Sequence, residues 1–433
     1  MAQPVRSRAS RSGDVSERGM LARLAARLTG RWHLERLAAI EQKVGAFGRA
    51  QREALAVQRR QLDELSASIP TRASEDAVTD LDRRLERVER LVQHQERVFS
   101  AALERAGILD DQGAGDRRFA RRIDELLRHN RPVIIGPWTG EVGFELIYWV
   151  PFVRWVVKTY GIPTQRLLVV SRGGTASWYG EIAARYVDTF DFYSPDEFRA
   201  AIGDAKKQRR VAAFDAELVR RVIDTHRLGR PDLLHPGMMY RLFMPFWKGL
   251  ASIARVEKYA AYCRLQRADE SIVRDLPSDY VAARFYFSEC FPDTPANREF
   301  VRSTIDGISR QMPVVLLNTP FQVDDHRDFD LRSGGRVIAV AAQMSPSRNL
   351  AVQTAVIAGA RAFVGTYGGY SYLAPFCGVN SLAFYSESTF KTQHLQVAQH
   401  VFRTLGGPSL VPLDVAAWPA VRLATSGSLV EAS

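Results

Sequence analysis

The sequence predicts an α/β protein with two parallel-sheet units, preceded by a helical coiled coil. Short β-branched runs alternate with helical patterns between residues 131 and 415, as is typical of parallel sheets with crossover helices. A four-heptad apolar repeat precedes these runs, and an aromatic, Met-rich segment divides them into two sets. With 433 residues, the chain is long enough for two or three domains.

The first segment, residues 1–35, is basic. Residues 1–60 contain twelve Arg and one Lys against five carboxylates, a net charge of +8 in a chain that carries +11. Residues 1–18 are expected to be disordered. Residues 20–32 form an apolar stripe beside arginines, typical either of a helix on an anionic membrane or of the start of a coiled coil. A basic tail before a near-neutral body indicates anchoring, and without an RNP or KH-type segment we expect no nucleic-acid binding.

Residues 36–106 are predicted to form the coiled coil. Apolar residues keep a 3–4 spacing over four heptads at Val78, Leu81, Leu85, Val88, Val92, Phe99 and Ala102, with Gln95 in the same series. Such helices bury their apolar stripe only against a partner. We therefore expect the chain to form a homo-oligomer through this segment.

Residues 107–130 are interpreted as a linker and a short helix, 131–255 and 256–415 as the two α/β domains, and 416–433 as a tail. We expect strands at residues 133–135, 167–171 and 211–214 in the first domain. In the second domain we expect them at 280–287, 314–318, 337–341, 362–365 and 381–385. The aromatic cluster at 238–247 is interpreted as a packing seam between the domains, with an acceptor groove as the alternative.

The cysteines and the hydropathy predict a cytoplasmic protein. Cys263, Cys290 and Cys377 have no CxxC spacing and suggest neither a disulfide framework nor a zinc site. We find no secretory signal and no uncharged apolar run of about 18 residues. Peripheral contact with the inner membrane face is an additional expectation, based on the basic helix.

A glycine turn marks the second domain. The strand ending "AFVG" runs into Thr366-Tyr367-Gly368-Gly369-Tyr370-Ser371, and a helix follows at once. A strand–glycine–helix junction presents free backbone N–H groups and the positive end of a helix dipole, which favour a phosphate or diphosphate. Tight turns also use glycine for steric reasons alone.

Two glutamates mark the first domain. In "GPWTGEVGFELIYWVP", Glu141 and Glu145 stand where the strand 133–135 ends and a helix, expected at 144–157, begins. A carboxylate among aromatic side chains is expected to have a raised pKa suited to a general base. The alternative is that one of them caps the helix.

These two segments carry a resemblance. "AGARAFVGTYGGYSYLAPFCGVNSLAFYS" is similar to the nucleotide-sugar half of GT-B glycosyltransferases of the heptosyltransferase type, and "GEVGFELIYWVP", with Pro151 six residues after Glu145, to their first half. The resemblance spans residues 131–415. It implies two Rossmann-like domains facing a cleft, and transfer from a nucleotide sugar to a cell-surface glycan or its lipid-linked precursor. The family's usual Gly-Asp pair is Phe144-Glu145 here, so Glu145 and Glu141 both stay candidates for the base.

The resemblance implies no cofactor beyond the nucleotide-sugar co-substrate and no metal, although Asp328-Phe329-Asp330 resembles a DxD metal motif. Within it, His326 is a further acid–base candidate, and Trp138 and Arg172 are acceptor-binding candidates. The donor-binding candidates are Arg284, Asn318, Thr366, Gly368, Gly369, Tyr370, Ser371 and Glu387. An internal salt bridge explains a buried Arg284 equally well.

Two other functions remain open from the sequence. One is another polysaccharide-modifying transferase on the same fold, such as a pyruvyl transferase. The other is a non-catalytic scaffold, in which the coiled coil is the function.

Overall fold

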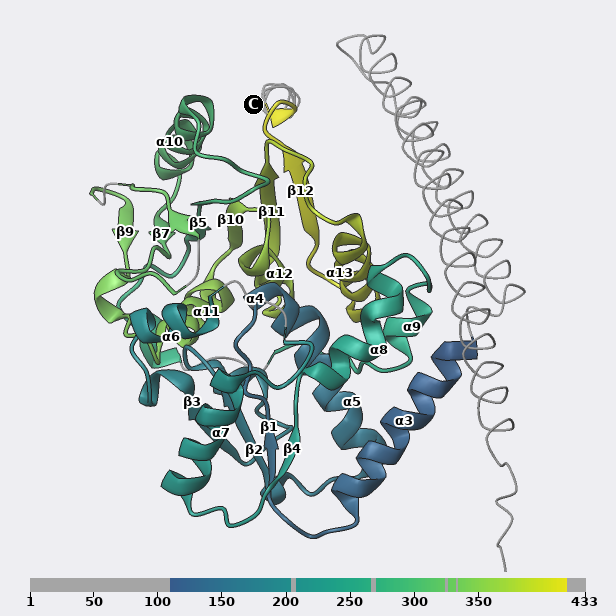
Figure 1. The fold of residues 1–433 in the computed structure, drawn as a ribbon. Helices are drawn as coiled ribbons and strands as arrows, with labels where there is room; N and C mark the ends of the chain where they lie inside the picture. The colour runs from purple at the N-terminus through teal and green to yellow at the C-terminus, as the bar shows by residue number, and fades with distance from the viewer. Residues whose placement is uncertain (1–109, 204–207, 266–269, 324–325, 332–333, 419–433) are drawn as a thin grey trace, which may run out of the picture. The chain divides into compact units, whose positions relative to one another are not determined.

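The structure is a computed structural model that describes residues 110–203, 208–265, 270–323, 326–331 and 334–418 (Figure 1). The expectations for the basic segment (1–35), the coiled coil (36–106) and most of the tail (416–433) lie outside these residues. No helix of the described part is long and apolar enough to cross a membrane.

The first half contains a four-stranded parallel sheet in the order β3-β2-β1-β4. Its strands are β1 (Val133–Ile135), β2 (Leu167–Ser171), β3 (Arg185–Asp188) and β4 (Asp232–Leu234). In the register, Ile134 pairs with Leu168 on one side and Leu233 on the other. The two central strands are buried along their whole length, which explains their continuous apolar runs.

The second half contains a six-stranded parallel sheet in the order β12-β11-β10-β5-β7-β9. Its strands are β5 (Val281–Arg284), β7 (Val314–Leu316), β9 (Val337–Ala339), β10 (Ala362–Thr366), β11 (Asn380–Tyr385) and β12 (Leu410–Asp414). The strand expected at 280–287 is divided at Phe285. Its last two residues, β6 (Tyr286–Phe287), leave the sheet and pair antiparallel with β8 (Arg327–Asp328).

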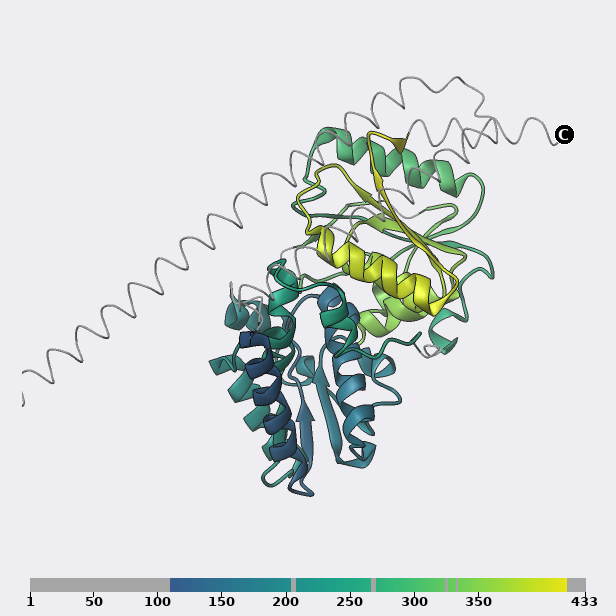
Figure 2. The same ribbon diagram turned by 90° about the vertical axis from the view of Figure 1, so that its right-hand side faces the viewer.

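Helices cover both sheets, and Figure 2 shows α13 lying across the second sheet and helices on both sides of the first. The helices are α3 (Asp110–Leu127), α4 (Val142–Phe144), α5 (Val150–Tyr160), α6 (Pro195–Ile202), α7 (Ala213–His226), α8 (Gly237–Trp247), α9 (Ala254–Glu257), α10 (Pro295–Ser309), α11 (Asn349–Gly359), α12 (Gly369–Phe376) and α13 (Thr392–Leu405). A π-helical turn, Glu145–Trp149, joins α4 to α5. Short 3-10 turns lie at 164–166, 175–178, 189–191, 270–273 and 341–343.

Two expectations about local structure were wrong. Residues 211–214 are not a strand, because α7 begins at Ala213 and Asp215 accepts the N–H of Ala212 at 2.9 Å, which closes the first turn of a helix. In the segment 107–130, where a linker and a short helix were expected, the helix α3 (Asp110–Leu127) is longer than expected and begins within the stretch interpreted as linker. Its buried residues Phe119, Ile123 and Leu126 follow helical spacing and pack on the core.

The two halves meet along α4 and α12, which lie side by side between the sheets in Figure 1. A Cβ on Gly369 would stand 2.8 Å from the N of Gly143, so only glycine allows the two segments to approach this closely. The aromatic end of the segment 238–247 joins the same seam. Trp247 packs on Phe144 at 5.5 Å and on His394 of α13 at 6.5 Å between ring centroids, as the seam interpretation predicts.

Candidate active cleft

A cleft with a cavity volume of about 740 Å³ is lined by both halves of the described chain. It opens at the carboxyl ends of β1, β2, β5 and β10, the edge at which open parallel sheets bind ligands. The charged residues that line it among those described are Glu141, Arg172, Arg199, Arg284, Glu289 and Lys391. Two of the four cations are paired with carboxylates outside the lining, Arg199 with Asp196 and Arg284 with Asp328, so Arg172 and Lys391 are the cations of the described lining most able to attract an anionic ligand.

Glu141 lies on the wall of this cleft, six residues beyond the end of β1. It is exposed and holds the N-cap position of α4, with extended backbone angles and no hydrogen bond from its side chain to the helix. The carboxylate is therefore not engaged in capping. Of the two glutamates expected at this junction, Glu141 is the one that a ligand can reach.

Glu145 lies behind the cleft wall. The π-helical turn directs its side chain into the core, where it has no exposed surface. One carboxylate oxygen accepts hydrogen bonds from Ser171 Oγ at 2.6 Å and Tyr179 Oη at 2.7 Å, and the other has no hydrogen-bond partner among the described residues. Burial raises the pKa of Glu145 to about 7, although Arg172, Ser171 and Tyr179 act in the opposite direction. The raised pKa expected at this junction is confirmed for Glu145, but its burial favours Glu141 as the group that meets a substrate.

Replacing Glu145 with Gln is expected to stabilise the protein progressively as the pH rises from about 5 to 8. The folded state holds the Glu145 proton up to a pKa of about 7, whereas the unfolded chain releases it near the ordinary glutamate pKa of 4.5. Wild-type stability therefore falls across this window, by about 3 kcal/mol for a shift of this size. Gln does not titrate and still accepts the bonds from Ser171 and Tyr179. Urea unfolding of both proteins from pH 5 to 8 measures the difference, with the exposed Glu299→Gln as the control, and a pH-independent difference would contradict the assignment.

The two acceptor-binding candidates lie in different surroundings. Trp138 is fully buried and stacks between Trp149, at 5.9 Å, and Tyr240, at 6.5 Å, so it belongs to the core and does not line the cleft. Arg172 follows β2, lines the cleft, and donates from Nη2 to the Gly140 carbonyl. This bond fixes the backbone directly before Glu141.

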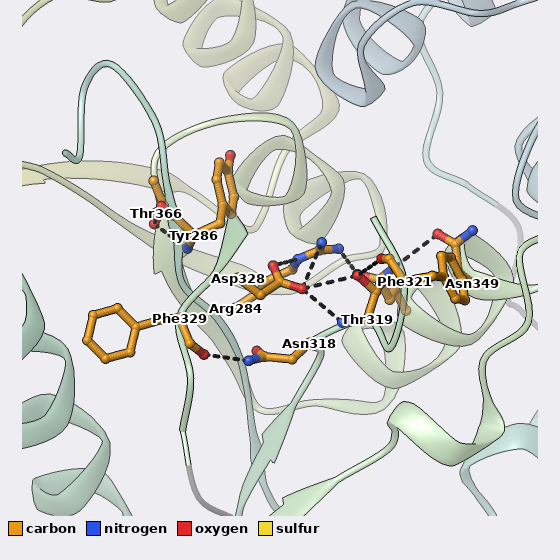
Figure 3. A network of polar contacts seen from close by, with 10 residues as sticks. Arg284, Tyr286, Asn318, Thr319, Phe321, Asp328, Phe329, Asn349 and Thr366 are labelled. Carbon is orange, nitrogen blue, oxygen red and sulfur yellow. Dashed lines mark hydrogen bonds and ion pairs between the residues drawn. The ribbon is translucent and has the colours of Figure 1, made fainter. Parts of the chain in front are cut away.

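Arg284 ends β5 inside the cleft and is held on several sides (Figure 3). Its Nε lies 3.1 Å and its Nη2 3.3 Å from the two carboxylate oxygens of Asp328, and its Nη1 donates to Gln353 Oε1. The guanidinium carbon also stands 4.0 Å from the centre of the Tyr370 ring. The internal salt bridge considered from the sequence is thus present, and Arg284 faces the cleft as well.

Asp328, the first acid of the DxD-like segment, is occupied by this network. Besides Arg284, it accepts the backbone N–H of Thr319 at 2.8 Å. Asn318, a donor-binding candidate, turns away from the cleft and donates from Nδ2 to the Phe329 carbonyl at 2.6 Å. Its role in this structure is to hold the loop that carries Asp328.

The glycine turn contributes Gly368, Gly369 and Tyr370 to the cleft wall. Thr366 and Ser371 do not line it. Ser371 Oγ donates to the Gly368 carbonyl at 2.7 Å, and Thr366 Oγ1 donates to the Tyr286 carbonyl at 2.9 Å. Their hydroxyl groups therefore shape the turn, while the turn itself faces the ligand space.

The remaining candidates are divided between the cleft and the surface. His326 lines the cleft with its ring 4.7 Å from that of Tyr286. Glu387 is exposed outside the cleft lining, and its backbone N–H donates to the Cys290 carbonyl. The structure thus brings together Glu141, Arg172, Arg284, His326, Gly368, Gly369 and Tyr370.

Sequence reasoning missed Lys391. This exposed residue holds the N-cap position of α13 and lines the cleft. Arg172 can be recognised in the sequence because this cation directly follows the carboxyl end of a predicted strand. Lys391 comes six residues after β11, however, and only the return of the chain toward the glycine turn brings it to the site.

Comparisons with known proteins found no matching family model and no matching curated protein. Similar solved structures include a family 9 glycosyl transferase from Veillonella parvula DSM 2008, at 12% identity over 66% of this chain and 87% of that one, with a TM-score of 0.38. Others are the E. coli ADP-heptose LPS heptosyltransferase II (13%, 61% and 88%, TM-score 0.36) and the E. coli heptosyltransferase WaaC with ADP (14%, 65% and 92%, TM-score 0.34).

All three TM-scores lie below 0.5. The similar solved structures named here are glycosyltransferases, two of them heptosyltransferases, the class that the sequence motifs resemble.

Proposed function

We propose that the chain transfers a glycosyl group from a nucleotide-sugar donor to a hydroxyl group of a cell-surface glycan or its lipid-linked precursor. The observation that carries the proposal is the composition of the cleft. One cavity at the carboxyl ends of two parallel sheets contains an exposed carboxylate, Glu141, together with cations and a glycine turn. Glycosyl transfer requires a base and a site for an anionic leaving group within the same space.

In the proposed step, the acceptor oxygen bonds to the anomeric carbon while the bond from that carbon to the diphosphate oxygen breaks. The proton of the acceptor hydroxyl passes to the carboxylate of Glu141. The electron pair of the broken bond stays on the diphosphate oxygen. Arg172 holds the Gly140 carbonyl and thereby positions the base.

The leaving diphosphate is assigned to Arg284, Lys391 and the backbone at the start of α12 from Gly369 onward, because the N–H of Gly368 already donates to Ser371 Oγ at 3.1 Å. Asp328 and Gln353 orient the Arg284 guanidinium before any ligand arrives, so little reorganisation is needed as charge develops. The turn at the start of α12 adds backbone N–H groups and the positive end of the helix dipole. A volume of about 740 Å³ is within the range of ligand pockets, roughly 300–1,000 Å³.

The proposal is tested by a thermal-shift screen of the full chain against nucleoside diphosphates, nucleotide sugars and phosphoenolpyruvate. A ligand at one hundred times its Kd stabilises a protein by about 2.7 kcal/mol, which is readily detected. A response to one nucleotide family supports a glycosyltransferase and names its donor class. A response to phosphoenolpyruvate alone would indicate a pyruvyl transferase, and no response at all would favour a scaffold.

Lys391→Gln is expected to weaken nucleoside diphosphate binding by roughly 10- to 150-fold, because a charge-assisted contact to a phosphate contributes roughly 1.5–3 kcal/mol. Folding should be unaffected, since Lys391 is exposed. Isothermal titration of wild type and variant measures the change, and Lys158→Gln, an exposed lysine on α5 outside the cleft, is the matched control. Equal affinities for all three proteins would remove Lys391 from the donor site.

The remaining parts of the proposal concern residues outside the described ranges. We propose a cytoplasmic protein that self-associates through residues 36–106. The basic segment 1–35 would hold it near the inner membrane face.

A further inference from the structure

A second cavity, of about 710 Å³, lies beside α3, α8 and α9, which are neighbours in Figure 1. None of its lining residues lines the catalytic cleft. We call it the basic pocket. Its apolar lining consists of Phe119, Val211, Leu233, Met238, Leu242, Met244, Pro245 and Leu250.

The charge of the basic pocket has one sign. Its lining includes six cations, Arg118, Arg122, Arg210, Arg241, Lys248 and Arg255, and no carboxylate among the described residues. Two of them are compensated from outside the lining. Arg255 pairs with Asp116 at 2.6 Å, and Arg122 pairs with Glu125 at 2.8 Å.

Three of the other cations in the lining are exposed to solvent. Arg210, Arg241 and Lys248 are exposed, and none of them forms an ion pair with a described residue. Bringing three such cations around one cavity is unfavourable unless an anion joins them. The pocket therefore has the charge of an anion site.

The apolar lining residues form what we call the floor of the pocket, and they make a simple anion a poorer ligand than a molecule that also has an apolar part. Val211 has 47% of its surface exposed, one of only two large hydrophobic side chains of the described part that are exposed to this degree. Phe119 and Leu242 are buried beneath it, and Met244 and Pro245 are partly exposed beside it. An aliphatic floor below a cationic rim matches a molecule with an anionic head and a hydrocarbon tail.

We infer that the basic pocket binds an anionic phospholipid of a membrane surface. Its phosphate would contact Arg210, Arg241 and Lys248, and the first part of its acyl chain would lie on the floor. Residues 1–60 carry +8, so charge disfavours this segment as the occupant. Single-stranded nucleic acid is disfavoured because its bases stack on aromatic surfaces, whereas this floor is mostly aliphatic. The inference does not depend on the proposed reaction.

The measurement has to report on the pocket and not on lipid binding by the whole chain, because the basic segment 1–35 is also expected to contact an anionic membrane. The full-length protein is titrated with dihexanoyl phosphatidylglycerol below its micelle concentration, and hydrogen–deuterium exchange is followed for residues 208–214 and 237–250. We expect protection of both segments. Dihexanoyl phosphatidylcholine and glycerol phosphate, which lack the net charge and the tails respectively, should require at least about tenfold higher concentrations.

Variants then test whether the protection by phosphatidylglycerol depends on the cations of the basic pocket. The triple variant Arg210→Gln, Arg241→Gln, Lys248→Gln should raise the half-saturating concentration by about a hundredfold, at about fivefold for each cation. The control Arg185→Gln, Arg274→Gln, Arg302→Gln removes the same charge from exposed positions elsewhere and should leave it unchanged. If the triple variant does not fold, Val211→Asp provides the second test, with an expected weakening of at least about fivefold.

Three results would overturn the inference. One is no protection of either segment by phosphatidylglycerol. Another is equal weakening by the triple variant and by its charge-matched control, which would mean a general effect of net charge. The third is glycerol phosphate binding as tightly as the lipid, which would mean an anion site without a lipid function.

Discussion

Glu141→Gln is expected to lower kcat for glycosyl transfer by about 100- to 10,000-fold, the usual contribution of a general base. Gln has nearly the same shape but cannot accept the proton of the acceptor hydroxyl. Since Glu141 is exposed and its side chain makes no hydrogen bond to the helix that it precedes, the substitution should leave folding unchanged. The Kd for the donor should also stay within about twofold, because loss of an interaction made only in the transition state lowers kcat alone.

The matched control is Glu289→Gln, the other carboxylate that lines the cleft. It is exposed like Glu141, and its removal changes the charge of the cavity equally. Initial rates with the donor identified by thermal shift would compare the two variants with wild type. A large loss in Glu289→Gln but not in Glu141→Gln would assign the base to Glu289. If Glu145→Gln lowers kcat without loss of stability, the general base would be the buried Glu145.

Arg284→Met is expected to lower the free energy of unfolding by about 3–5 kcal/mol, the usual effect of removing one partner from a buried ion pair. Asp328, with 14% of its side chain exposed, would lose both bonds to the guanidinium, and Gln353 would lose its donor. The same change removes a cation from the cleft, so nucleoside diphosphate binding should weaken strongly. Urea unfolding and isothermal titration measure the two effects separately.

Arg298→Met is the control for this prediction. Arg298 also forms a two-bond ion pair with an aspartate, Asp293, but 40% of its side chain is exposed. Exposed pairs contribute about 0–1 kcal/mol, so this variant should stay near wild type. Asp328→Asn combined with Arg284→Met should recover part of the lost stability without recovering ligand binding. Equal destabilisation by Arg284→Met and Arg298→Met would contradict a buried, preoriented arginine.

In the first sheet, the two strands that the sequence predicted correctly share one property, which is burial on both faces. β1 and β2 occur at the expected residues because "VII" and "LLVVS" are continuous apolar runs in the middle of a parallel sheet. β3 and β4 lie at the two edges of the sheet, where only part of each strand is buried, and their sequences "RYVD" and "DLL" contain charged residues. In this sheet the edge strands are therefore the ones that local hydrophobicity does not mark, whereas in the second sheet the edge strand β9 (Val337–Ala339) lies within the expected range 337–341.

The false strand at 211–214 has a related cause. "VAAF" is apolar, but Val211 is exposed and α7 begins at Ala213, where Asp215 accepts the N–H of Ala212. Local hydrophobicity does not distinguish a residue that enters a core from one that lines a pocket. Here Val211 lines the basic pocket, whereas Phe214 packs on Tyr193 and Phe198.

The sequence by itself determined the parallel α/β architecture, the glycine turn, and the set of polar residues that follow the strands, because these depend on local periodicity and on backbone chemistry. It did not determine which of those residues share the cleft. Glu141 and Glu145 are four residues apart, yet one is exposed and the other is fully buried. The π-helical turn fixes the direction of Glu145, and its two partners come from β2, which ends at Ser171, and from Tyr179, which follows the 3-10 turn 175–178. Lys391 reaches the same cavity only because α13 begins there, so contacts between distant parts of the chain, which no local pattern contains, decided the composition of the site.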